Sequence, residues 1–263
     1  MSDQEPLLVE RREDGVVVLT FALPDRRNTM TAALTDAWGT TIAALRGDRS
    51  VRCVVVTGQG SAFCAGGDVT WIGGEPDATV DALRDRMMPF YQTWLTVRTL
   101  DVPTIAAING PAVGAGLCLA MACDLRYAAE GAKLSAPFTA LGMHPGMAAT
   151  YLLPELVGLP AAREMLFTGR VLTGTEAAVA GLVNRAFPAE SLLDEVLAIA
   201  ATVAAQAPVA LRLTKTALAG GPRTFEAALE WEALAQPVTL ATADLQEGLR
   251  ARAERRPARF TGV

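Results

Sequence analysis

Two glycine-rich loops, each directly after a short uncharged run, constrain this 263-residue chain more than any other feature. The first loop, 58–68, follows the apolar run 53–57, and the second, 109–116, follows the run 103–108. Small residues after a strand let a ligand approach the backbone closely, and a helix N-terminus adds unpaired N–H groups. The pattern predicts two strand–loop–helix units. They either aim N–H donors at one anionic oxygen, or they are tight turns that serve packing alone.

Segments with strand-like and helix-like periodicity alternate through the first half of the chain, and helices fill the last third. Strands are expected at 7–10, 16–21, 53–57, 103–108, 125–128 and 182–186. Helices are expected at 31–45, 83–100, 117–123, 161–166, 175–180, 192–205, 209–219 and 225–256, the last with a break at Pro237. The glycines and proline of 69–81 predict a mobile segment. No linker is evident, so we expect one α/β domain over 1–263, with a core at about 1–190 and a helical region at about 191–263.

Composition excludes several classes of partner. The net charge is −5 and no basic stripe alternates with aromatic residues, which argues against nucleic acid. The uncharged stretch 105–123 is interrupted by glycines, a proline and Asn109, so it indicates a buried strand, turn and helix rather than a membrane span. Four cysteines without a CxxC pair, together with one histidine, argue against a metal site. A reduced, cytoplasmic protein is the simplest interpretation.

Two further features have competing interpretations. A cluster of arginines near the C-terminus is either a solvated helix end or a clamp for a phosphate; its members are Arg250, Arg252, Arg255, Arg256 and Arg259. The Gly114-Ala-Gly116 sequence resembles the start of a dinucleotide-binding fingerprint. Its third glycine is absent, Ala120 is only a poor substitute, and Asp124 comes too early for the ribose-binding acid, so a nicotinamide or flavin cofactor is not expected.

The two loops together resemble those of the crotonase family, the enoyl-CoA hydratases and isomerases. The resemblance is carried by Phe63-Cys-Ala-Gly-Gly-Asp68 and Asn109-Gly-Pro-Ala-Val-Gly-Ala-Gly116. Similar segments at 24–28, 119–126, 141–146, 167–169 and 180–184 extend it over nearly the whole chain. The resemblance implies a crotonase-like spiral of ββα units with a C-terminal helical trimerisation region, and self-association as a trimer or hexamer. It also implies an acyl-CoA thioester substrate, as in the lyases and isomerases of fatty acid metabolism, and no cofactor besides the coenzyme A of that substrate.

The resemblance assigns roles residue by residue. The backbone N–H groups of Gly67 and Ala115 would hold the thioester oxygen as an oxyanion hole. The coenzyme A would pass along Arg26 and Arg27 and meet the loops near their glycines; the remaining contacts implied are Ala65, Gly66, Asp68, Gly114 and, from a neighbouring subunit, Phe260. For Asp68 a helix N-cap is the alternative role.

The chain departs from the family at the positions that usually carry catalytic carboxylates. The two hydratase glutamates are matched here by Cys118 and Phe138, and an isomerase carboxylate is matched by Gly146. A paired-glutamate hydration is therefore not expected. The Cys118 thiol, in an apolar helix, is expected to have a raised pKa and to fill the core.

His144 is the chain's single histidine, and the family places its segment beside the acyl pocket. It is either a proton-transfer group or a histidine bonded to backbone. Three carboxylates that could reach a pocket are Asp68, Glu75 and Asp124. Large apolar side chains either line an acyl site or belong to the core; these are Trp71, Met87, Met88, Phe90, Trp94, Phe138 and Met143.

Two hypotheses for function follow. The first is an acyl-CoA enzyme of altered chemistry, an isomerase, decarboxylase or thioesterase that uses the oxyanion hole and His144. The second is a non-catalytic acyl-CoA carrier or sensor.

Overall fold

A six-stranded, mostly parallel sheet forms the centre of the molecule, whose computed structural model describes residues 5–221 and 223–263. The strand order is β1-β2-β3-β4-β6-β9, where β1 and β2 form an antiparallel hairpin and all other pairs are parallel. The strands are β1 Leu7–Arg11, β2 Val16–Phe21, β3 Cys53–Gly58, β4 Thr104–Ile108, β6 Leu125–Ala129 and β9 Arg185–Phe187. Buried apolar residues in β2, β3 and β4 explain their position inside the sheet.

A second, three-stranded sheet lies beside the first and was not predicted. Its order is β5-β7-β8, with β5 Ala112–Val113 parallel and β8 Leu172–Thr173 antiparallel to the central β7 Lys133–Ser135. Two of these strands are only two residues long, too short to show alternation in the sequence. The sheet matters for function because β5 belongs to the second glycine-rich loop.

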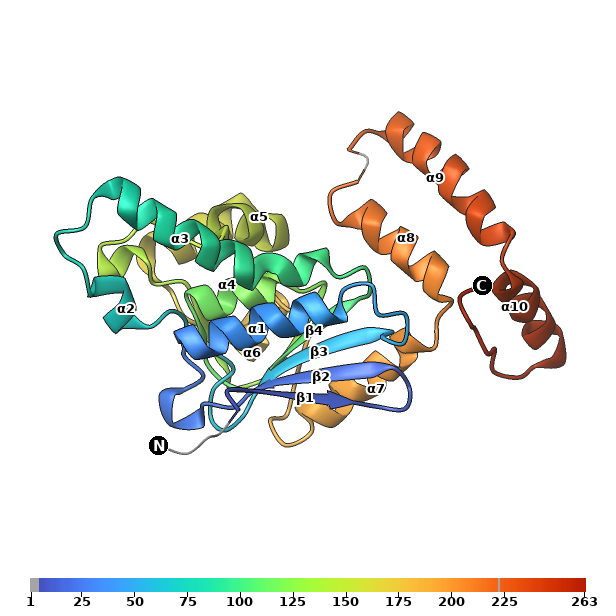
Figure 1. Cartoon of the computed structure of the whole chain (residues 1–263), viewed down its shortest axis with the longest axis horizontal. Coiled ribbons are helices and arrows are strands. Elements are labelled where there is room, and N and C mark those ends of the chain that lie inside the picture. Colours follow the sequence, from blue (N-terminus) through green and yellow to red (C-terminus); the bar gives the residue numbers. More distant parts are fainter. Residues whose placement is uncertain (1–4, 222) are drawn as a thin grey trace.

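Helices cover the main sheet and build the outer parts of the molecule (Figure 1). They are α1 Ala32–Leu45, α2 Val69–Gly73, α3 Val80–Leu95, α4 Ala115–Ala122, α5 Ala149–Thr168, α6 Gly174–Val179, α7 Leu192–Ala204, α8 Pro208–Leu218, α9 Phe225–Leu240 and α10 Ala243–Glu254. Helix α7 packs on the strands, α1 packs against α3, and α4 packs against α5.

An aromatic cluster joins α1, α3 and β2. Trp38 and Trp94 stack with ring centroids 5.3 Å apart, and Phe21 meets each of them at under 6 Å. All three side chains are fully buried. The Trp94 indole N–H donates to Thr35 Oγ1 at 3.1 Å, which satisfies its polar atom inside the core.

Several predicted boundaries were wrong. Helix α9 continues through Pro237 and ends at Leu240, and α10 begins after the N-cap Thr242, so the break lies beyond the proline. The expected strand 182–186 is displaced to Arg185–Phe187. The expected helix 83–100 is α3 followed by a 3-10 turn, Thr96–Thr99. Segment 69–81 begins with the short helix α2, and its mobility stays a prediction.

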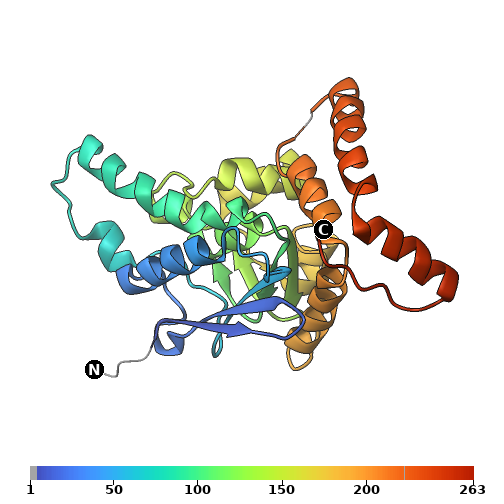
Figure 2. The same cartoon turned by 45° about the vertical axis from the view of Figure 1, so that its right-hand side comes forward.

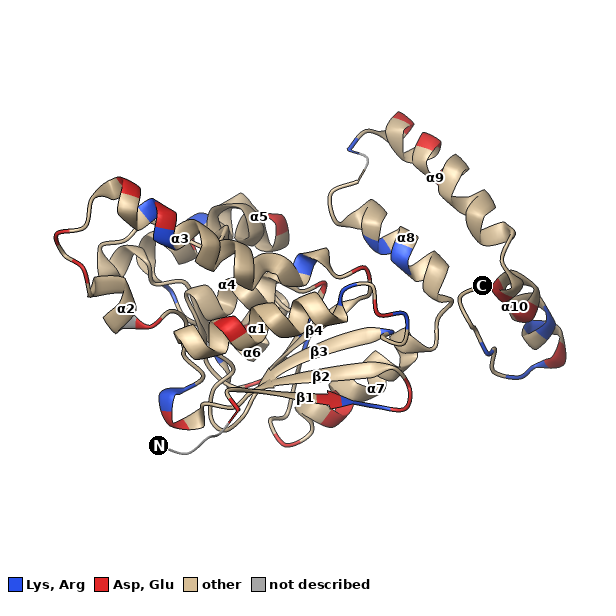
Figure 3. Cartoon of the chain, in the orientation of Figure 1, with Lys and Arg blue, Asp and Glu red and all other residues tan. Residues whose placement is uncertain are grey.

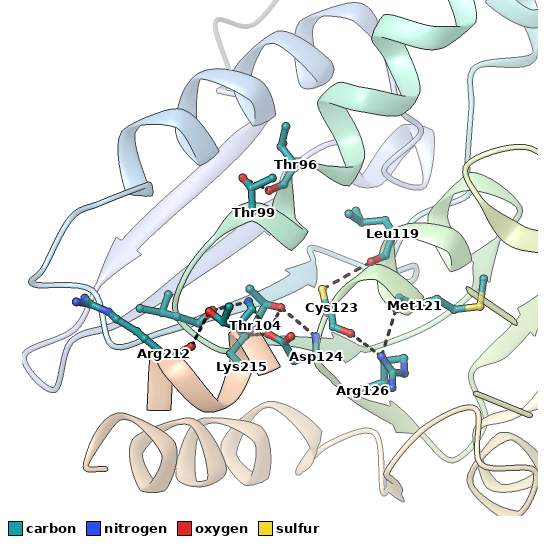
Figure 4. A network of polar contacts seen from close by, with 12 residues as sticks. Thr96, Thr99, Thr104, Leu119, Met121, Cys123, Asp124, Arg126, Arg212 and Lys215 are labelled. Carbon is teal, nitrogen blue, oxygen red and sulfur yellow. Dashed lines mark hydrogen bonds and ion pairs between the residues drawn. The ribbon is translucent and has the colours of Figure 1, made fainter. Parts of the chain in front are cut away.

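Helices α8, α9 and α10 form a C-terminal arm that extends away from the sheet in both views (Figures 1 and 2). No residue of α9 is buried. A half-buried ion pair ties α8 to the core: Lys215 Nζ lies 2.8 Å from Asp124 Oδ2 and donates to the Val102 carbonyl at 2.7 Å (Figure 4). The same carboxylate accepts from the backbone and side chain of Thr104 at 2.7 and 2.8 Å.

Among the described residues, no single helix is long and apolar enough to cross a membrane. The pair α7 and α8 reaches the required length and hydropathy only when both helices are counted together across their 107° bend.

Candidate active site

The two glycine-rich loops lie side by side and are hydrogen-bonded to each other. The N–H groups of Phe63 and Cys64 both donate to the Pro111 carbonyl at 3.1 Å, and the Val113 N–H donates back to the Cys64 carbonyl at 3.0 Å. A backbone bridge pairs Cys64 with Ala112. The loops therefore form one unit with a fixed relative position.

Glycine is required where the loops touch. A Cβ on Gly66, whose φ is +96°, would lie 2.6 Å from the Val113 carbonyl oxygen. A Cβ on Gly116 would overlap the carbonyl of Cys64. Both neighbours are backbone atoms, so neither can move aside as a side-chain end would.

Two backbone N–H groups beside this contact have no internal partner. Gly67 lies in the first loop, and Ala115 is the first residue of α4, after Gly114 with φ +54°. Neither N–H donates in the hydrogen bonds formed within 5–221 and 223–263. Helix α4 carries no charged side chain, and all eight of its residues are buried (Figure 3). Its dipole therefore acts in apolar surroundings at the Ala115 end.

Both residues line a cavity of about 100 Å³ between the loops, α3 and the segment 137–147. Its apolar wall includes five of the predicted side chains, Trp71, Met87, Phe90, Phe138 and Met143. The wall also includes apolar side chains that were missed, namely Ile72, Tyr91, Val113, Pro137, Leu141 and Met147. Two predicted members do not belong to it, because Met88 is an exposed side chain outside the wall and Trp94 lies in the aromatic core.

A larger cavity of about 420 Å³ lies under α8, between Asp124, Lys215 and the apolar side chains of α5 and α8. Neither glycine-rich loop lines this cavity, and so the unpaired N–H groups of Gly67 and Ala115 do not reach it. We therefore place the candidate site at the smaller cavity. Asp124 was predicted to be able to reach a pocket, but this carboxylate is held by Thr104 and Lys215 and does not line the smaller cavity.

The other two candidate carboxylates have structural partners. Asp68 is the N-cap of α2, accepting from the Thr70 N–H at 2.9 Å, and it pairs with Arg26 at 2.8 Å. The backbone bond from Thr70, followed by the side chains of Thr70 and Arg26, holds the pKa of Asp68 below its usual value. Glu75 pairs with Arg86 at 3.2 Å, and the Arg86 guanidinium lies 4.8 Å above the Trp71 ring. The N-cap role of Asp68 is confirmed.

The three positions that would carry a catalytic carboxylate hold none. Cys118 is fully buried, its Sγ lies 3.7 Å from the Gly146 carbonyl oxygen, and burial raises its pKa, as predicted. Phe138 contributes its ring to the cavity wall. The place of a side chain at Gly146 is taken by Tyr91, whose hydroxyl would be 2.5 Å from a Cβ built there.

His144 lines the cavity and its ring is bonded to backbone, so the backbone-bonded interpretation is confirmed and the proton-transfer role stays a prediction. Its Nδ1 lies 2.8 Å from the Pro145 carbonyl oxygen. Because a carbonyl oxygen only accepts, Nδ1 carries the proton, and Nε2 of the neutral ring is free to accept one.

The remaining residues of the predicted coenzyme site lie at the edge of the cavity or outside it. Ala65 and Gly114 line it, and the Ala65 N–H donates to the Arg27 carbonyl at 3.0 Å. The side chains of Arg26 and Arg27 do not line it. Phe260 lies on the arm, against Gly248. The coenzyme contacts stay predictions.

The C-terminal arginines include one with a clear structural role. Arg256 binds both oxygens of Glu247, at 2.6 and 2.9 Å, and this lowers the pKa of Glu247 to about 2. Arg259 donates its backbone N–H to the same carboxylate at 2.9 Å. Within 5–221 and 223–263 no three His, Cys, Asp or Glu side chains gather closely enough to hold a metal ion.

Two asparagines hold the first loop in place. Both lie in segments that carry the family resemblance, but this role was not predicted. The fully buried Asn28 donates to the carbonyls of Gln59 and Ala62 at 3.0 and 2.8 Å. Asn109 accepts from the Gly58 N–H at 3.1 Å and donates to the Gly60 carbonyl at 3.1 Å. Tyr91 could have been found from its i, i+4 spacing to Met87, since both face the cavity.

Comparison with known proteins agrees with this geometry. The family model for Enoyl-CoA hydratase/isomerase matches residues 11–263. A Mycobacterium tuberculosis protein named "Probable enoyl-CoA hydratase EchA12" is 38% identical over 268 residues, covering 97% of this chain and 92% of its own length. The human mitochondrial enoyl-CoA hydratase domain-containing protein 2 is 34% identical over 256 residues, covering 95% of this chain and 87% of its own.

A solved structure shows that the fold is shared as well. The crystal structure of an enoyl-CoA hydratase from Bacillus anthracis superimposes with a TM-score of 0.92 at 32% identity, covering 98% of this chain and 100% of that one. The α/β architecture with its C-terminal helical region is therefore the crotonase fold, as predicted. The loops, the fold and the match over residues 11–263 show that this chain belongs to the enoyl-CoA hydratase/isomerase family.

Proposed function

We propose that the protein binds an acyl-CoA thioester with its acyl group in the cavity, and that it polarises the thioester carbonyl with the N–H groups of Gly67 and Ala115. One observation carries the proposal: both N–H groups lack an internal acceptor and line the same cavity. Negative charge develops on the carbonyl oxygen as an enolate or tetrahedral species forms. Fixed dipoles stabilise that charge without reorganising, by about 3–4 kcal/mol for each donor.

The rest of the wall supports chemistry other than paired-glutamate hydration. Cys118, Phe138 and Gly146 offer no carboxylate, and the buried Cys118 thiol stays protonated because burial raises its pKa. The side chain suited to accept a proton is His144, through Nε2. An isomerase, a decarboxylase or a thioesterase would each pass through an oxyanion held by the same two donors.

A non-catalytic acyl-CoA carrier or sensor is the second candidate function. The replaced carboxylate positions favour it, while His144 at the cavity favours an enzyme. Replacing His144 with Ala separates the two, because turnover is then lost while thioester binding is retained. Equal turnover in the variant and the wild type would remove His144 from the mechanism.

The proposed function also includes a path for coenzyme A and an assembly of several copies of the chain. The nucleotide part of coenzyme A would pass Arg26 and Arg27, and no resident cofactor is needed beyond it. The arm would pack on further copies of the chain as a trimer or hexamer, which would also bring Phe260 to a neighbour's coenzyme. This assembly is supported by exposed apolar side chains on α9, namely Phe225, Leu229, Leu234, Val238 and Leu240.

The test removes one of the two backbone donors by a substitution at Ala115, a small cavity-lining residue. Ala115→Pro deletes the N–H at the first position of a helix, where proline is tolerated. Ala32→Pro makes the same change at the first position of α1, outside the cavity. Products from 2-enoyl, 3-enoyl, dienoyl, 3-oxoacyl and malonyl thioesters are followed by mass spectrometry.

We expect Ala115→Pro to lower turnover of the best thioester by about 10²–10³-fold, and Ala32→Pro to leave it unchanged. Both variants should keep the wild-type melting temperature within a few degrees. Full activity of a folded Ala115→Pro protein would refute the oxyanion role. Rapid addition of water to the 2-enoyl thioester would show that hydration proceeds without the usual glutamates.

A further inference from the structure

The Tyr91 hydroxyl is a polar atom in the cavity that neither the fold nor the proposed chemistry uses. Tyr91 projects from α3, lines the cavity and is half-buried. None of the hydrogen bonds among the described residues involves its Oη. Apolar side chains surround it, since Met87, Phe90, Phe138 and Met147 line the same wall.

The hydroxyl belongs to the same cavity as the proposed thioester position. A Cβ built on Gly146 would be 2.5 Å from Tyr91 Oη and 3.0 Å from Cζ, so the phenol fills the space of a side chain there. The Gly146 carbonyl is in turn contacted by Cys118, which is three residues, or about one helical turn of ~5 Å, from Ala115. Ala115, Gly146 and Tyr91 line one cavity, so an acyl group held at Ala115 would extend along the wall that carries the phenol.

We propose that Tyr91 Oη donates a hydrogen bond to an oxygen atom at carbon 3 of the acyl group, so that the preferred ligands are oxygenated thioesters of the 3-oxoacyl or 3-hydroxyacyl class. This inference rests on the proposed function, because it needs the acyl group to enter the cavity. Tyr91 then determines specificity and takes no part in proton transfer.

Desolvation explains why the oxygen matters. A bound acyl chain displaces water from the hydroxyl, and a hydrocarbon chain leaves it unpaired, whereas a carbonyl or hydroxyl oxygen pairs it. A site with such a donor rejects analogues that lack the acceptor more strongly than an apolar wall can. Burial, and to a smaller degree the neighbouring Cys118 thiol, raises the pKa of Tyr91, which keeps the hydroxyl protonated and therefore a donor.

The test compares two ligands that differ in one oxygen. Acetoacetyl-CoA and butyryl-CoA share a four-carbon chain, and neither carries the 2,3 double bond or the 3-hydroxyl group that hydration or dehydration needs. Their dissociation constants are measured by calorimetry for the wild type and for Tyr91→Phe. Tyr151→Phe is the matched control, because its hydroxyl bonds Arg223 outside the cavity.

We expect the wild type and Tyr151→Phe to bind acetoacetyl-CoA about tenfold more tightly than butyryl-CoA. Tyr91→Phe should lose that preference because its dissociation constant rises for acetoacetyl-CoA alone. Tyr91→Phe should keep the wild-type melting temperature, because Oη makes no internal bond. A preference that survives in Tyr91→Phe would overturn the inference, since enolate binding at the loops would then explain it, and the proposed function would stand. Wild-type protein that prefers neither ligand also overturns it. Failure of both ligands to bind overturns the proposed function itself.

Discussion

The two ends of helix α4 differ in whether their polar groups are hydrogen-bonded within the protein. At the first end, the N–H of Ala115 has no internal acceptor and faces a cavity, beside the equally unpaired N–H of Gly67. At the last end, Asp124 is bound by Thr104 and Lys215 (Figure 4), and the buried Arg126 donates to three backbone carbonyls. The helix between them is wholly buried and uncharged.

The first end of α4 is therefore suited to bind a ligand, and the last end to stabilise the fold. Buried polar groups are normally hydrogen-bonded, so donors left unpaired at one end are available to a ligand. Groups paired at the other end serve to hold the arm and the sheet together. Substitutions at the two ends should therefore change different measurements.

The largest effect on stability is expected at Gly116, where α4 touches the first glycine-rich loop. Gly116→Ala should lower the free energy of unfolding by about 3 kcal/mol or more, because its Cβ would overlap the Cys64 carbonyl. Gly114→Ala is the control. Its Cβ would lie 3.8 Å from the Phe138 ring, and only its φ of +54° is costly, by about 1–3 kcal/mol. Urea unfolding measures both, and equal losses would contradict the tight contact between the loops.

The last end is tested by Asp124→Ala. Lys215, whose side chain is 9% exposed, would lose its carboxylate, and we expect a loss of about 2 kcal/mol in unfolding free energy with thioester binding unchanged. Asp101→Ala is the control for the same helix: Asp101 lies 3.6 Å from Arg212 of α8, but its side chain is 47% exposed, so the pair should contribute under ~0.5 kcal/mol. A change in thioester affinity in Asp124→Ala would show that the two ends are not separate.

The pH dependence of Asp68, at the edge of the first end, gives a smaller effect. Asp68→Ala removes a helix cap and should cost about 1 kcal/mol near neutral pH. Because the pKa of Asp68 is lowered in the folded state, its contribution is complete above the ordinary Asp value and is lost as pH falls through the folded value. The stability curves of wild type and variant should therefore converge below about pH 3.9. Curves that stay parallel to pH 2 would argue against this role.

The smallest effect is expected from Gly146→Ala. The new methyl group would press on the flexible end of Tyr91, so the hydroxyl should shift while stability changes by about 1 kcal/mol or less. The preference for acetoacetyl-CoA over butyryl-CoA should fall a few-fold, less than in Tyr91→Phe. An unchanged preference would mean that the hydroxyl does not need its present position.

The sequence predicts this fold and its loops better than it predicts the cavity wall. The apolar runs of β2, β3 and β4 and the glycines of both loops are local signals, and the structure confirms them. The second sheet is made of two-residue strands that exist only through pairing with Lys133–Ser135, so no local pattern reveals it.

Helix α3 shows why the wall was harder to predict. Trp94 and Tyr91 lie three residues apart, yet one stacks on Trp38 in the core and the other faces the cavity. Aromatic residues lie on both faces of this helix, and only its docking between α1 and the loops decides which face meets a ligand. The same holds for Asp124, whose partner Lys215 lies 91 residues away in sequence and cannot be identified from spacing.

The four buried cysteines lie in pairs near the two ends of α4, so their rates of alkylation can report local opening at each end separately. Burial raises the pKa of Cys53, Cys64 and Cys123 to about 12, and that of Cys118 as well. Alkylating reagents attack the thiolate, so the native protein should resist them until a local opening exposes a thiol. Cys64 and Cys118 would then report openings at the loop end, and Cys53 and Cys123 openings at the Asp124 end. The order in which a maleimide marks them would show which half of the molecule loosens first.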